Sequence, residues 1–176
     1  RDLVQRLAEY MFNERFSELA RKADAKFLGA GVSDDRLGRL VSAFSIAASV
    51  PDGKLEDGVA VVATEARRVG EHGFTEPEID RAKKWIAALY ERSYAERDKS
   101  ESGSFAQECV RHFLVEEPMP GIAYEHQLVR QFLPGITLAE TSAMAKRLVA
   151  DESRVLAAVS PEKPGIRVPT DAELVA

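Results

Sequence analysis

The periodicity of the apolar residues constrains the fold of this chain most. It is helical first, then strand-like over two successive segments, and then helical again, so strands and helices do not follow one another in turn. Residues 2–24 place apolar side chains such as Leu3, Leu7 and Met11 at helical spacing. Segments 26–33 and 41–50 then alternate with a period of two, and the turn residues between them predict an antiparallel hairpin. From residue 54 to about residue 150 the period is helical again, over roughly five helices, and residues 154–159 predict a last, buried strand.

Segregated strands and helices indicate an α+β fold, in which an antiparallel or mixed sheet is covered by a run of helices. Three strands are few for so many helices, so we expect one or more strands before Arg1 in a longer parent protein. Both ends are expected to be internal to that protein. Residues 1–165 are expected to form one domain, and residues 166–176 to begin a linker.

The sharpest local signal is a helix start at Thr75. Thr75 and Glu78 have the spacing of a capping box, and Phe74 and Ile79 have the spacing of a hydrophobic staple. The first helix is expected to expose a polar face formed by Arg15, Glu18, Arg21 and Lys22. The core is expected to include Phe74, Ile79, Leu89, Phe105, Phe113 and Val155.

Composition excludes some partners. A formal net charge of −5 argues against a nucleic-acid surface, which would be basic. No run of 18 or more apolar residues appears, so no membrane span is predicted. The single cysteine, Cys109, cannot form an internal disulfide and lies on the apolar stripe of a predicted helix, where a buried, inert thiol is expected.

No catalytic constellation is visible. His72, His112 and His126 have no second histidine or cysteine at ligand spacing, and the HxxEH and HExxH motifs are absent. His72 is expected to cap a helix, and His112 and His126 to lie at or near the surface. No GxSxG motif is present, and Gly29-Ala30-Gly31 is too short for a dinucleotide fingerprint. We therefore predict no catalytic residue and no metal ligand in this chain.

Three segments, taken in order, resemble the insulinase (pitrilysin) family of zinc metallopeptidases. The stretch EARRVGEHGFTEPEIDRAKKWI is similar to the family's "GfteeEl" helix start, and FNERFSELARKADAKFLGAG is similar to its helix followed by an edge strand. PGITLAETSAMAKRLVADESRVLAAVSPEK resembles the end of the same domain. The resemblance covers residues 11–161.

The resemblance implies an accessory role in a larger enzyme. Homologous α+β domains of a metallohydrolase-like fold occur in pairs in that family, and only the first of a catalytic half carries the inverted zinc motif. This chain is similar to the second, non-catalytic domain, which helps to enclose a peptide substrate. The implied cofactor is zinc in the parent protein and none in this chain. The implied partners are other domains of the same chain or a partner subunit, and the peptide.

The family also implies a binding role for the edge strand, which captures peptides in some members by adding a strand to the sheet. The residues that correspond are Leu28, Gly29, Ala30 and Gly31. The competing interpretation is that Gly29 and Gly31 relieve crowding against a packed helix. The segment RKADAKFLGAG lacks the tyrosine of family members in which the inactive half completes the active site, which favours the zinc-bearing half.

A second function stays open, in which the parent is a catalytically inactive relative that acts as a partner or scaffold. Sequence upstream of Arg1 would separate the two, by the presence or absence of HxxEH. Compartment is left open: a periplasmic location follows only by analogy with exported relatives, and a cytoplasmic one is compatible with the composition.

Overall fold

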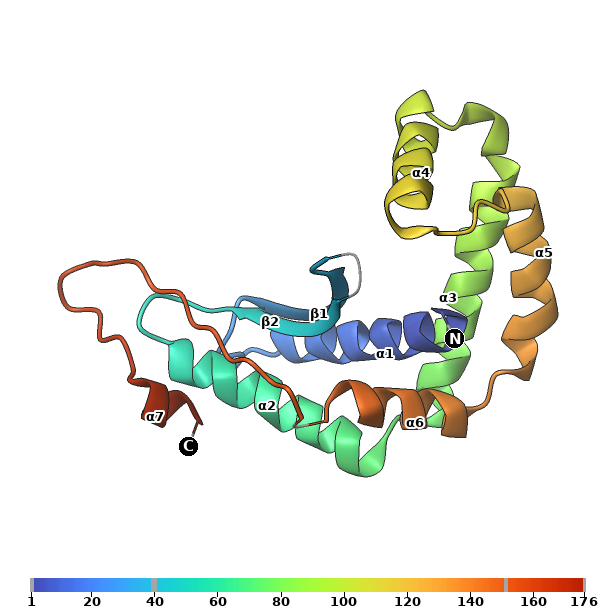
Figure 1. The fold of residues 1–176 in the computed structure, drawn as a ribbon. Helices are drawn as coiled ribbons and strands as arrows, with labels where there is room; N and C mark the ends of the chain where they lie inside the picture. Colours follow the sequence, from blue (N-terminus) through green and yellow to red (C-terminus); the bar gives the residue numbers. More distant parts are fainter. Residues whose placement is uncertain (1, 39–40, 151, 176) are drawn as a thin grey trace.

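The computed structural model describes residues 2–38, 41–150 and 152–175. Figure 1 shows two parts that together make an L: a body of α1, the hairpin, α2 and α6, and an arm in which α3 rises from the body with α5 beside it and α4 at its top. The elements are α1 (Asp2–Ala20), β1 (Gly29–Arg36), β2 (Ser42–Ser49), α2 (Leu55–His72), α3 (Glu76–Ala95), α4 (Ser102–Val115), α5 (Ile122–Phe132), α6 (Leu138–Leu148) and α7 (Asp171–Val175), with short 3₁₀ turns η1 (Arg97–Lys99) and η2 (Leu133–Gly135). The α+β prediction is confirmed, with a two-stranded antiparallel sheet in the part of the chain that the structure describes.

The core is centred on α1, because its apolar residues return to one face every three or four positions. Leu7, Met11, Phe12 and Phe16 are each at most 1% exposed. The ring of Phe12 lies 5.5 Å from that of Phe74 in an edge-to-face arrangement, a geometry favoured by the ring quadrupoles. α1 therefore packs against β1, α3 and α6 at once.

The hairpin covers one side of this core. Its register pairs Val32 with Ile46, and the side chains of both lie against the buried cluster. Val32 is buried, whereas Leu28, which lies within the predicted strand 26–33, precedes β1 and is 71% exposed. The strand thus begins at Gly29, three residues later than the sequence predicts.

Local capping fixes the starts of two helices. At α6 the Glu140 amide donates to Thr137 Oγ1 at 3.2 Å, while the Glu140 carboxylate accepts from the Thr137 amide at 2.7 Å. The box predicted at Thr75 and Glu78 is confirmed at the start of α3. These contacts satisfy backbone N–H groups that the first helical turn leaves without partners.

Three of the residues predicted to lie in the core are exposed. Phe105 and Phe113 on α4 are 54% and 81% exposed, and α4 buries none of its residues. Residues 154–159 form no strand, and Val155 is 90% exposed. The apolar pattern identifies faces that are suited to burial. Among the described residues, however, nothing packs on the apolar face of α4 or on residues 154–159. Phe74 and Ile79 are confirmed in the core, and Leu89 is half-buried.

None of the described helices is both long enough and apolar enough to cross a membrane.

Candidate functional site

The outer edge of β1, which faces away from β2, is the part of the sheet where a peptide could add as a strand. Backbone groups alternate between the two edges of a strand. The Val32 amide donates to Asn13 Oδ1 at 2.8 Å, and Asn13 Nδ2 donates to the Val32 carbonyl at 3.3 Å, so Val32 faces this outer edge. By alternation the backbone groups of Ala30 and Asp34 face it as well.

Asn13 therefore occupies the middle of the edge with a side-chain amide that imitates a neighbouring strand. No hydrogen bond joins the outward groups of Ala30 and Asp34 to the described residues. A peptide strand would take these groups directly and would replace the two Asn13 bonds at Val32 with two bonds of its own. The exchange is close to neutral in hydrogen bonds.

The four predicted edge residues do not all lie in β1. Leu28 precedes the strand, and its amide donates to Ser49 O at 2.7 Å. Gly29, Ala30 and Gly31 lie in β1. A Cβ at Gly31 would lie 3.0 Å from Asn13 Oδ1, whereas a Cβ at Gly29 would meet nothing within 4 Å. Crowding against α1 thus accounts for Gly31 but not for Gly29.

Sequence reasoning missed Asn13 and its neighbours on α1. Gln5, Glu9 and Asn13 are spaced by four residues and so form one polar row on α1. Gln5 Nε2 donates to Glu9 Oε1 at 3.0 Å. Polar residues at this spacing within an otherwise apolar helix are the signal that could have shown the row.

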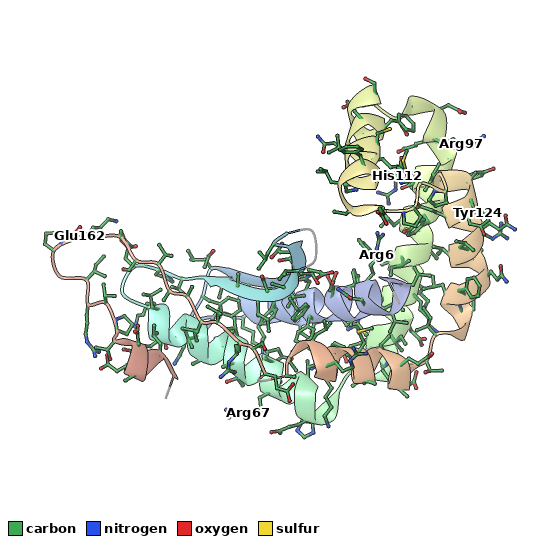
Figure 2. The ribbon with its side chains drawn as sticks, viewed as in Figure 1. Arg6, Arg67, Arg97, His112, Tyr124 and Glu162 are labelled. Atoms are coloured by element: carbon green, nitrogen blue, oxygen red, sulfur yellow. The ribbon has the colours of Figure 1, made fainter. Side chains whose placement is uncertain are left out.

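Glu9 extends the polar edge toward Asp34. Burial raises the pKa of the Glu9 carboxyl, the hydrogen bond from Gln5 opposes this, the Asp34 carboxylate raises it further, and Arg6 opposes. Arg6 itself rises from α1 on the concave side of the L, and its Nη1 donates to the Tyr90 hydroxyl at 2.8 Å (Figure 2).

An open cavity of about 860 Å³ lies beyond this edge, between the tip of the hairpin and α4. The hairpin side is formed by Asp34, Leu37, Gly38 and Ser42, and the α4 side by Arg111, Phe113, Leu114, Val115 and Glu117. Figure 1 shows that the two elements face each other across the concave side of the L.

The three histidines lie on different helices. His72 ends α2 and is exposed, and the His112 ring on α4 lies 2.7 Å from the Glu117 carbonyl. The prediction of a surface position is wrong for His126, which is 8% exposed because its ring stacks on Tyr94 at 4.7 Å and its Nε2 lies 2.7 Å from Glu91 Oε2. Within the described ranges no group of three or more His, Cys, Asp or Glu side chains could hold a metal ion.

Cys109 is exposed, which contradicts the predicted buried thiol. The reason is the same as for Phe105 and Phe113: the apolar stripe of α4 faces solvent among the described residues.

No family model matches the chain. It is 29% identical over 166 residues to a "Zinc protease PQQL-like" protein of Arabidopsis thaliana, a match that covers 92% of this chain and 14% of the relative. The chain thus spans about one seventh of that relative's length.

Two solved structures share its fold. The first half of the periplasmic protease PqqL from Escherichia coli matches 84% of this chain and 32% of its own, with a TM-score of 0.76 and 14% identity. A predicted insulinase-family protease from Yersinia pestis matches 86% of this chain and 33% of its own, with a TM-score of 0.74 and 18% identity. The chain is thus similar in sequence to part of a zinc protease, and in fold to part of PqqL and of an insulinase-family protease.

Proposed function

We propose that this chain is a non-catalytic, accessory domain of a zinc-dependent metalloendopeptidase, where it forms part of the substrate chamber and holds peptides. The observation that carries the proposal is the match to a zinc protease along 92% of a chain whose described residues offer no cluster of metal ligands. Zinc, and the residues that would hold it and activate the attacking water, would then come from another domain of the parent protein. That domain and the peptide are the proposed partners.

The outer edge of β1 is the proposed peptide-holding element, with Ala30 and Asp34 as the free backbone positions and Gly29 and Gly31 between Leu28 and Val32. Support comes from the open backbone groups and from the space beside Gly29. Strand addition takes its affinity from main-chain hydrogen bonds, so it suits a protein that handles many peptide sequences.

A pair of proline substitutions tests this edge. Ala30→Pro removes an outward N–H and places a ring on the binding edge, yet it spares the β1–β2 ladder because proline is tolerated where the N–H faces away from the partner strand. Ala48→Pro is the matched control: Ala48 pairs with Ala30 and so directs its N–H to the opposite edge of the hairpin. We expect Ala30→Pro to weaken binding of a fluorescent, β-prone peptide at least tenfold in an anisotropy titration, and Ala48→Pro to change it less than twofold. Equal effects of the two prolines would refute the β1 edge as the binding element.

A further inference from the structure

We propose that the cavity between the hairpin tip and α4 is a side-chain subsite for a peptide bound on the outer edge of β1, and that it takes a bulky apolar side chain next to a cationic residue. The inference rests on the proposed peptide-holding role of β1 and adds a preference for particular side chains. A peptide strand on the edge forms backbone hydrogen bonds that do not depend on the peptide sequence. A preference for particular peptide side chains must therefore come from a feature such as this cavity.

The cavity is walled by apolar side chains that the described residues leave uncovered. Leu37 on the hairpin side is 70% exposed, and Phe113 and Leu114 on the α4 side are 81% and 55% exposed. Burying such side chains against a ligand stabilises the complex in proportion to the apolar area removed from water. A leucine or phenylalanine side chain matches the apolar walls and fits within an open cavity of about 860 Å³.

The cavity is continuous with the strand edge. Asp34 belongs to both, because its backbone faces the outer edge of β1 and it lines the cavity. A peptide paired with β1 carries same-face side chains about 6.6 Å apart. β1 ends two residues after Asp34, and Leu37, which follows the strand directly, also lines the cavity. This continuity identifies an extended peptide as the occupant.

The charge around the cavity favours a cation beside the apolar residue. Arg111 Nε and Glu117 Oε2 lie 3.1 Å apart and offset each other. Among the side chains that the structure describes, no ion pair joins Asp34 to a cation. A lysine or arginine on the bound peptide would pair with the carboxylate of Asp34, which lines the cavity at this end of the edge.

The test compares two phenylalanines of α4. The probe is a fluorescein-labelled, acetylated heptapeptide of sequence Thr-Val-Lys-Thr-Phe-Val-Thr, followed by anisotropy. Phe113→Ala removes a wall of the cavity, and we expect Kd to rise about tenfold, the size of effect that a central interface residue gives. Phe105→Ala is the matched control, since Phe105 is exposed on the same helix but does not line the cavity, and it should change Kd less than twofold.

The peptide itself provides the second arm. Replacing its phenylalanine with serine should weaken binding to the unchanged protein about tenfold. The same replacement should leave the Kd for the Phe113→Ala variant unchanged, because that variant has already lost the wall of the cavity. Replacing its lysine with glutamate should weaken binding, and Asp34→Asn should reduce that discrimination.

Three results would overturn the subsite. If Phe113→Ala binds as tightly as the unchanged protein, or if both phenylalanine variants weaken binding equally, the cavity is not a subsite while the β1 edge still stands. If the unchanged protein binds no peptide at all, the proposed function of the edge fails together with the subsite.

Discussion

At the scale of single residues, Arg15 departs most from its expected place on the polar face of α1. Its guanidinium reaches Glu65 on α2 at 2.9 Å and Glu78 on α3 at 3.0 Å, and it donates to the Gly73 carbonyl at 3.0 Å. The Glu65 side chain is 2% exposed and depends on Arg15 and, at 3.7 Å, Arg68 for charge compensation. One side chain thus joins three helices.

Arg15→Met should therefore leave Glu65 charged and poorly compensated in the interior. We expect the free energy of unfolding to fall by about 3–5 kcal/mol, the usual loss when one partner of a buried ion pair is removed. Arg81→Met is the matched control, because Arg81 is exposed and lies 3.7 Å from an equally exposed Glu18, a pair worth about 0–1 kcal/mol. Urea denaturation measures both, and equal losses would contradict the role assigned to Arg15.

The same cluster makes stability depend on pH. Burial raises the pKa of Glu78, but hydrogen bonds from Arg15 and Thr75 outweigh it and leave the pKa below its usual value. A carboxyl with a lowered folded-state pKa stabilises the fold above its unfolded-state pKa, about 4.3, and the contribution is lost as pH falls through the folded-state value.

We therefore expect the unfolding free energy to drop as pH falls below about 5, and to drop less steeply in Glu78→Gln, which cannot take up that proton. Urea denaturation at a series of pH values from about 7 to 3 measures the two slopes. Parallel slopes for the two proteins would show that Glu78 is not a source of the acid sensitivity.

At the scale of secondary-structure elements, what could be predicted depended on how local the cause is. The starts of α3 and α6 follow from residues three apart in sequence, and the capping box at the start of α3 was predicted correctly. The exposure of α4 could not be predicted, because an apolar stripe shows that a face can be buried but not whether a partner is present. The burial of His126 was missed for a related reason: its partner Glu91 lies 35 residues away.

The candidate site was predictable only in part. Its location in the Gly29–Gly31 strand came from a family resemblance, whereas Asn13, which occupies the edge, comes from a helix whose contact with β1 spans 19 residues of sequence. The cavity joins the hairpin to α4, elements about 70 residues apart, and no local pattern reports such a pairing.

Truncating a large apolar side chain to alanine should have different effects on the unfolding free energy in α3 and in α4. Ile79→Ala on α3 should destabilise by about 2–5 kcal/mol, because Ile79 is 2% exposed and truncation leaves a cavity. Phe105→Ala on α4 should change the unfolding free energy by about 0.5 kcal/mol or less. Chemical denaturation of this 176-residue chain measures both. A large loss at Phe105 would mean that α4 is packed, as the sequence alone suggested.

At the scale of the whole molecule, the L shape brings the hairpin and α4 to one concave side (Figure 1). The cavity between them is lined by Leu37, Phe113 and Leu114, whose side chains are exposed. The relative it matches is about seven times longer than the matched segment. A chamber wall contributed by one domain of a larger peptidase is consistent with both features.

The central claim is that this chain serves a zinc peptidase without holding the zinc. The most direct measurement is the metal content of the purified chain after incubation with zinc and exhaustive dialysis, read by mass spectrometry, with hydrolysis of a quenched fluorescent peptide followed in parallel. We predict far less than one zinc per chain and no hydrolysis, while the same preparation binds peptide. One tightly held zinc per chain, together with cleavage, would contradict the account and would assign catalysis to this domain itself.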